Sequence, residues 1–456
     1  MRVGCIVDYS VEEIIPSEGE TIAAKRSQRL TERLLMRAKD RVLVPRGWWT
    51  STLIEYLGLA VLVGFTVHLI SPQWGRASVD GVFSGPTIPY LAQFLKMVFG
   101  IRFRLSVQYV EIFFFILFPI TMYFLVHFLT RRKLIALFAV LFASLPESVF
   151  AKARLLGGFY VGDAQHIASL GVVPLAMLVL LSFLRRGGFG HLLISALLSS
   201  VILLISPFGF LTYLVFALVS TFSEMLLGYG RLKLVRFVTV FVLTACLVAF
   251  WYNPGFSTWL LFGPSGKEFR VAAGQLLPVS LVIVPVLGTL GFLLFDRKPH
   301  LQPLFLAIGW TIIFSLLVAV SRLGTLPLVP SRFLPELGIA VSFLLAVTAV
   351  VAIDTLKQSK IRLFRMVSDA TFSNSVTTFL LLVLTVAILW PRATAVTHFE
   401  EEEVTRESMA KGALWLIRDD FDGPSLVSGY IITGATLVGL AGVGLGDRRQ
   451  LGHEGL

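Results

Sequence analysis

The sequence predicts an all-α polytopic membrane protein, and three observations support this fold class. The chain of 456 residues is 56% hydrophobic and only 15% charged, and its mean hydropathy of +0.82 lies far above that of a soluble domain. Apolar stretches suited to the roughly 30 Å hydrocarbon core of a bilayer recur between residues 51 and 391. Basic residues gather in the short connections between these stretches. Because backbone groups in lipid must be satisfied within the segment, each stretch is expected to be a helix.

About eleven spans are expected, and together they form a transmembrane domain over residues 51–391. A further apolar stretch, Ile88–Phe99, is too short to cross the bilayer and is expected to be interfacial or re-entrant. The expected spans cover residues 51–70, 107–129, 134–145, 167–184, 191–205, 208–228, 234–252, 276–295, 303–321, 334–353 and 376–391.

Basic residues orient the spans in a multi-pass arrangement in the cell membrane. The connections assigned to the inside hold 14 Lys and Arg residues, whereas the opposite connections hold 10. The positive-inside rule therefore places the N-terminus in the cytoplasm and the C-terminus outside. The net charge of +11 is explained by orientation and by anionic lipid headgroups, so nucleic-acid binding is not expected. The ten outward-facing cations need a separate reason.

Two polar segments flank the membrane domain. Residues 1–50 carry apolar side chains every four positions among many basic ones, which predicts an amphipathic helix on the cytoplasmic membrane surface. A solvated helix or a partner-binding arm is the alternative. Residues 392–456 are expected to form a small extracytoplasmic segment. Within it, Ile431–Leu445 is apolar enough to suggest a twelfth span, but its small residues and its length argue against one.

The long connections face outward, and candidate site residues lie in them. Asp80 is the only acid of the first outer loop, where a carboxylate could act as general base on an acceptor hydroxyl. The alternative is a solvated aspartate that favours a turn before Gly81.

The second outer loop contains Glu147, Asp163 and His166, which could bind a divalent cation or contact a sugar. Their spacing matches no metal motif, and Asp163 could instead cap the following helix. Cys5 and Cys246 provide neither a disulfide framework nor a metal-binding pair.

Outer cations could form an anionic pocket. Arg332 precedes the tenth span and could hold a phosphate through paired hydrogen bonds. It could equally reach lipid headgroups or pair with Glu336. Weaker candidates for the same pocket are Arg154, Lys267 and Arg270.

Three acids lie in or near expected spans: Glu55, Glu111 and Glu224. Glu55 and Glu224 are expected to reach the membrane interface from the span ends, whereas Glu111 lies near the outer end of the second span and could face a cavity. The stretch Ser206-Pro207-Phe208-Gly209 predicts a tight outer hairpin between the fifth and sixth spans.

Four short motifs resemble those of the GT-C superfamily of membrane glycosyltransferases, and specifically its large prokaryotic branch. They are Ile205–Gly209, Ala249–Pro254, Pro330–Phe333 and Ala413–Ile417. The resemblance implies transfer of a sugar from a polyprenyl-phosphate donor to an extracytoplasmic acceptor. It also implies that Asp80 deprotonates the acceptor while Arg332 and Arg270 stabilise the departing phosphate.

Two other functions remain open. The span count alone permits a transporter or lipid flippase, although no inverted repeat is visible. Ser206 stands where the superfamily often has histidine, which leaves room for a non-catalytic subunit of a membrane complex. The expected partners are a lipid-linked sugar donor and membrane lipids.

Overall fold

The computed structural model describes an all-helical chain. It covers residues 48–71, 85–145, 154, 164–262, 283, 286–291, 293, 301–322, 333–357, 375–395 and 424–453, and no strand occurs among them. The chain divides into two compact units, Met1–Leu53 and Ile54–Leu456. Only residues 48–53 of the first unit are described, so the predicted amphipathic helix lies outside the described residues.

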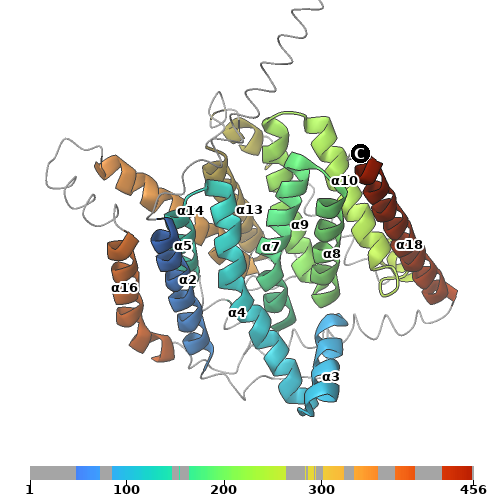
Figure 1. The fold of residues 1–456 in the computed structure, drawn as a ribbon, viewed down its shortest axis with the longest axis horizontal. Coiled ribbons are helices and arrows are strands. Elements are labelled where there is room, and N and C mark those ends of the chain that lie inside the picture. Colours follow the sequence, from blue (N-terminus) through green and yellow to red (C-terminus); the bar gives the residue numbers. More distant parts are fainter. Residues whose placement is uncertain are drawn as a thin grey trace, which may run out of the picture. The chain divides into compact units, whose positions relative to one another are not determined.

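The second unit is a bundle of helices (Figure 1). The elements are α2 (Trp48–Ile70), α3 (Thr87–Phe99), α4 (Phe103–Thr130), α5 (Lys133–Ala143), α7 (Ala164–Arg186), α8 (Phe189–Ile205), α9 (Pro207–Leu226), α10 (Gly230–Leu247), α11 (Pro254–Phe262), α13 (Gln302–Arg322), α14 (Leu334–Lys357), α16 (Ser375–Ala395) and α18 (Pro424–His453).

Ten of the eleven expected spans coincide with helices. The eighth, 276–295, is described only at residues 283, 286–291 and 293, all of which are helical. Among the described residues, six helices are long and apolar enough to cross a membrane, which is the character of a multi-pass membrane protein. These six are Leu53–Ile70, Phe103–Thr130, Ala164–Arg186, Pro207–Leu226, Gln302–Val320 and Leu334–Ile353.

The centre of the bundle is α7, which is buried along nearly its whole length and packs closely against α4. A helix that is apolar on all sides needs such neighbours. The contact is tight at Gly171, whose carbonyl accepts a hydrogen bond from Thr121 Oγ1 at 2.9 Å. A side chain at Gly171 would overlap the backbone of Phe114. Glycine therefore allows the two backbones to approach, as in other membrane helix pairs.

Substituting Gly171 by alanine is expected to destabilise the protein by about 1–3 kcal/mol, because the added methyl group forces α4 and α7 apart. Gly64 of α2 is the matched control, since a methyl group there meets no atom within 4 Å. There the alanine variant should be neutral, or more stable by up to about 1 kcal/mol through helix propensity. Unfolding midpoints in one detergent compare the two variants, and equal midpoints would contradict the close packing.

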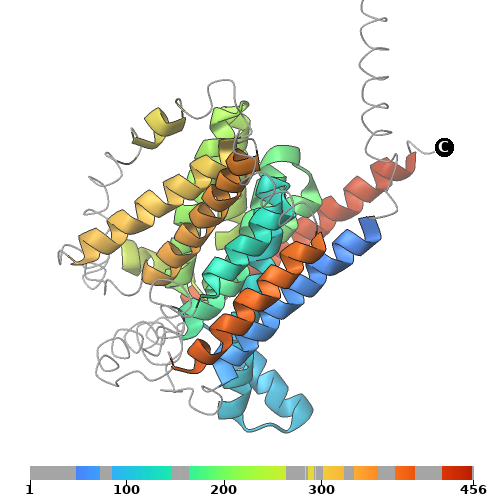
Figure 2. The ribbon, with the colours of Figure 1, turned by 90° about the vertical axis from the view of Figure 1, so that its left-hand side faces the viewer.

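Two pairs of helices that are distant in sequence run side by side in the same direction. α4 runs parallel to α7, because Phe114 meets Gly171 and, further along both helices, Arg185 lies over the ring of Phe128. α2 and α16 also run parallel (Figure 2). Near the starts of these two helices Gly58 approaches Phe379, and near their ends His68 stacks on Trp390. The first and last helices of the predicted membrane domain thus lie side by side in the same direction.

The predicted hairpin between α8 and α9 is confirmed. α8 ends at Ile205, and Ser206 caps α9 by accepting a hydrogen bond from the Gly209 amide at 3.2 Å. Pro207 occupies the first position of α9, where a missing amide hydrogen costs nothing.

The end of the chain contains a long helix, α18, which lies along α10 (Figure 1). Thr433 Oγ1 donates to the Cys246 carbonyl at 3.1 Å and accepts from the Phe250 amide at 3.0 Å. The segment Ile431–Leu445 is therefore part of a 30-residue helix and not an isolated stretch of 15. Its apolar part, Val427–Ala441, is one of the shorter apolar helices of the bundle.

Candidate functional site

A histidine and a glutamate meet inside the bundle where α7 and α14 begin. His166 Nε2 lies 2.9 Å from Glu336 Oε1, and the two side chains are 1% and 0% exposed. The distance is that of a hydrogen bond, but the angles are not, and neither group has another hydrogen-bond partner in the described part of the chain. Buried polar groups without aligned partners are costly, so their presence favours a functional role.

Aromatic rings surround this pair. The ring of Phe208, in the first turn of α9, meets the His166 imidazole edge-on at 4.8 Å between centroids. Phe208 also contacts Phe333, which directly precedes α14, at 5.2 Å. Ser169 Oγ donates to the His166 carbonyl at 2.6 Å. The starts of three helices, α7, α9 and α14, therefore contribute side chains around the pair.

A second buried polar residue, Arg154, packs against aromatic rings of α4. The Arg154 guanidinium carbon is 4.0 Å from the ring centre of Phe118 and 4.8 Å from that of Phe115, both on α4. The residue is 3% exposed, and none of its three side-chain nitrogens has a hydrogen-bond partner among the described residues. Burial lowers the pKa of Arg154 to about 9, so the group remains cationic at neutral pH. Ring faces attract the cation but leave its donors unused.

The arrangement can attract an anion and hydrogen-bond a polar substrate. Arg154 contributes one positive charge, and His166 and Glu336 contribute polar atoms without aligned partners among the described residues. α4 and α7 pack closely at Gly171, which links the helix that carries the Arg154 rings to the helix that carries His166. Within the described ranges, no group of three His, Cys, Asp or Glu side chains could hold a metal ion.

The predicted site residues are only partly described. His166 and Arg154 are both buried and lack aligned hydrogen bonds. The remaining candidates lie outside the described residues: Asp80, Asp163, Lys267, Arg270 and Arg332.

Glu336 was not predicted as a site residue. In the sequence it was considered only as a pairing partner for Arg332. The sequence signal that could have identified it is an acid at the start of a long apolar span.

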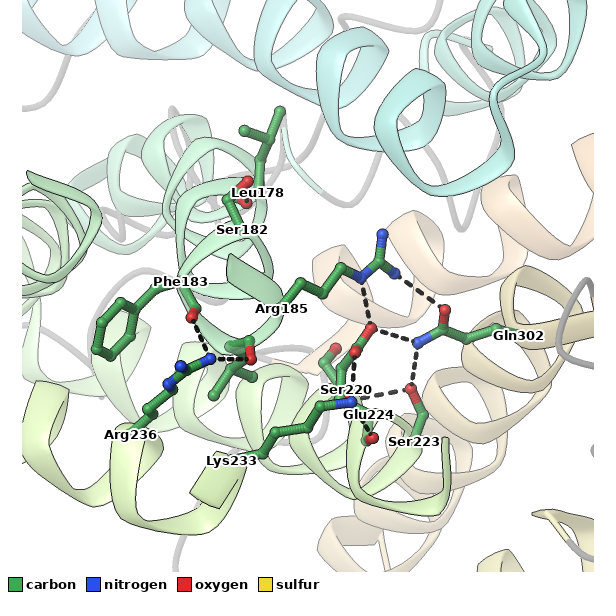
Figure 3. Close-up of polar contacts among 11 residues, drawn as sticks. Leu178, Ser182, Phe183, Arg185, Ser220, Ser223, Glu224, Lys233, Arg236 and Gln302 are labelled. Atoms are coloured by element: carbon green, nitrogen blue, oxygen red, sulfur yellow. Dashed lines mark hydrogen bonds and ion pairs between the residues drawn. The ribbon is translucent and has the colours of Figure 1, made fainter. Parts of the chain in front are cut away.

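A second polar cluster occupies the other end of α7 (Figure 3). Glu224 Oε1 accepts hydrogen bonds from Arg185 Nε at 2.8 Å and from Gln302 Nε2 at 2.7 Å. Its Oε2 pairs with Lys233 Nζ at 3.2 Å, and Lys233 also donates to the Glu224 carbonyl. Gln302 receives a hydrogen bond from Arg185 Nη2 at 2.9 Å and donates to Ser223 Oγ at 3.0 Å. The cluster joins α7, α9, α10 and α13.

Glu224 is enclosed by this cluster. The residue is 1% exposed, because cations from two other helices extend toward its carboxylate. Glu55 instead pairs with Lys133, and both side chains remain partly exposed. Since every charged group around Glu224 has a partner, the cluster is a structural clamp.

Basic residues at this end also terminate α7. Arg236 Nη1 donates to the carbonyl of Leu184 at 2.9 Å and to that of Phe183 at 3.4 Å (Figure 3). These carbonyls belong to the last turn of α7, where carbonyl groups run out of helical donors; the carbonyl of Phe183 also accepts from the Gly187 amide at 2.8 Å. Part of the basic charge assigned to membrane orientation therefore serves packing as well.

The described site consists of a buried cation and a buried histidine–carboxylate pair, in a bundle of apolar helices. No protein-family model matches this chain, and no match is found among curated proteins.

Proposed function

We propose that the protein is a membrane glycosyltransferase of the GT-C type, acting in the cell membrane. It would transfer a glycosyl group from a polyprenyl-phosphate donor to an acceptor hydroxyl on the extracytoplasmic side. The observation that supports the proposal is the buried His166–Glu336 pair, whose polar atoms lack aligned partners among the described residues, as do those of the buried Arg154. A binding cavity for an anionic, hydroxyl-rich substrate requires such groups.

The roles follow the chemistry of each residue type. Asp80 would take the proton from the acceptor hydroxyl, whose oxygen forms the new bond to the sugar carbon. The bond between that carbon and the phosphate oxygen breaks, and polyprenyl phosphate leaves with the electron pair. Arg332, Arg270, Lys267 and Arg154 would stabilise the phosphate charge. Asp163 and His166 would contact the substrate, with or without a divalent cation.

Two of the proposed site residues are close in sequence to the buried pair. Asp163 lies three residues before His166 and Arg332 four residues before Glu336. This closeness in sequence supports assigning them to the same proposed site.

We retain eleven crossings with a cytoplasmic N-terminus, a prediction that rests on the apolar stretches and on the distribution of basic residues. Six of the described helices are long and apolar enough to cross a membrane. A small extracytoplasmic tail remains the prediction for residues 392–456.

The purified protein, reconstituted into liposomes with a radiolabelled polyprenyl-phosphate sugar, tests the proposal. Transfer of label to an acceptor is expected, and Asp80→Asn should abolish most of it because the amide cannot accept the proton. Transfer that is unchanged in this variant would exclude Asp80 as the base. Absence of transfer together with movement of the lipid across the bilayer would instead identify a flippase or transporter.

The transporter alternative has one observation in its favour. A buried histidine–carboxylate pair can take up or release a proton inside a membrane domain, as proton-coupled carriers require. A protein with neither transfer nor flux, but with a stable membrane partner, would be a non-catalytic subunit.

A further inference from the structure

The hairpin formed by α3 and the start of α4 exposes a row of large apolar side chains. α3 buries only two side chains, Ile88 and Ala92. Its other large apolar residues face away from the protein, with Met97 70% exposed. The exposed set is Tyr90, Leu91, Phe94, Met97, Val98 and Phe99. A contiguous apolar face of this kind marks a contact with lipid or with another protein.

The hairpin is firmly attached to the bundle at its base. A side chain at Gly85 would overlap the backbone of Leu204 at the end of α8. The ring of Tyr90 meets Trp251 edge-on at 6.2 Å, just beyond the end of α10. At the tip, Gly100 adopts a left-handed conformation with φ of 65°, and its amide donates to the Lys96 carbonyl at 3.0 Å. The exposed face therefore has a defined position next to the helix ends.

The tip of the hairpin is positively charged. Lys96, Arg102 and Arg104 are exposed, and none of these side chains has an ion pair or hydrogen bond with a described residue. No acidic residue occurs between positions 85 and 110. An apolar face bordered only by cations is complementary to a surface that offers both acyl chains and negative charge.

The length of α4 places the tip at the depth of lipid headgroups. With 28 residues, α4 is about 42 Å long at about 1.5 Å per residue. A bilayer measures about 40–45 Å when both headgroup regions are included. Arg131 and Arg132 mark the opposite end of α4, at the other headgroup region. The start of α4 and the tip beside it then lie among the headgroups of the facing leaflet and not in bulk water.

We propose that the α3–α4 hairpin is a lipid-binding element of the facing leaflet. The apolar face of α3 lies at the boundary of the acyl chains, and the three cations of the tip bind the phosphate groups of anionic phospholipids. This assignment explains the presence of three of the ten cations in the outer connections, which the positive-inside rule does not explain. It is independent of the proposed transfer reaction, because it involves none of the residues of that site.

A fluorescent probe at position 98 tests the proposal on the full-length protein. V98C is introduced after C5S and C246S remove the native thiols, and bimane is attached in liposomes of phosphatidylcholine with phosphatidylglycerol. Quenching by brominated phosphatidylglycerol is compared with quenching by brominated phosphatidylcholine. We expect quenching by the anionic lipid to exceed quenching by phosphatidylcholine at least about fivefold. The combined substitution K96Q/R102Q/R104Q should make the two lipids quench equally.

A matched variant, R131Q/R186Q/R231Q, removes three exposed cations elsewhere and should leave the preference at position 98 unchanged. Equal quenching by both lipids in the unsubstituted protein would overturn the charge assignment. Quenching by aqueous iodide without quenching by either lipid would overturn the membrane location. A signal that depends on protein dilution but not on lipid composition would assign the face to a second copy of the chain instead.

Discussion

Replacing Glu224 by glutamine is expected to lower the free energy of unfolding by about 3–5 kcal/mol, because Lys233 and Arg185 then lose the charge that balances them. Lys233, on α10, is only 9% exposed, and its ammonium group donates a hydrogen bond to the carbonyl of Glu224 on α9. Gln302 loses its bond to a carboxylate oxygen at the same time. Reversible unfolding in mixed detergent micelles measures the difference.

Two controls separate this clamp from a general effect of charge. Glu55→Gln breaks the partly exposed pair with Lys133 and should cost no more than about 1 kcal/mol. Combining Glu224→Gln with Lys233→Met removes the unbalanced cation as well, so it should destabilise the protein less than the two single effects added together. Strict additivity would show that the contact between Glu224 and Lys233 contributes little.

Replacing Glu336 by glutamine is expected to reduce sugar transfer about 100-fold while stability changes little. The amide keeps the shape of the carboxyl group but can no longer exchange a proton with His166 or balance its charge. Because the Glu336 oxygens have no aligned hydrogen bonds among the described residues, few stabilising contacts are lost. Transfer rates in liposomes, together with unfolding midpoints, test both halves of the expectation.

Ser182→Ala provides the matched control for Glu336, since it removes a buried polar group from α7 that bonds only to the carbonyl of Leu178. Its transfer rate should equal that of the unsubstituted protein. His166→Gln should resemble Glu336→Gln, and the two changes combined should be no worse than either alone if the groups act as a pair. Normal transfer by Glu336→Gln would remove the pair from the site.

Local sequence was sufficient for the helices and for several of their ends. The spans appear in the sequence because a membrane helix satisfies its own backbone, so length and apolar content identify it without knowledge of its neighbours. The hairpin between α8 and α9 was predictable for the same reason, since Ser206 and Pro207 act within one turn. Ile88–Phe99 was recognised as too short to cross, and it forms the separate helix α3.

Contacts between distant segments were not predictable. His166 and Glu336 are separated in sequence by about half of the membrane domain, and nothing in either local sequence indicates the other. Glu224 was expected at an interface because its position near a span end was visible, whereas the cations that bury it come from α7 and α10.

The sequence by itself thus determined an all-helical membrane protein, most of its helix positions and two of the buried polar residues, because these depend on composition and short-range periodicity. The tertiary structure alone decided which charges are balanced. In the folded protein, Glu224 has hydrogen-bond and ion-pair partners. By contrast, Arg154, His166 and Glu336 have no aligned hydrogen-bond partner among the described residues. The physical reason is that the cost of burying a charge depends on the groups packed around it, and packing brings those groups from other helices.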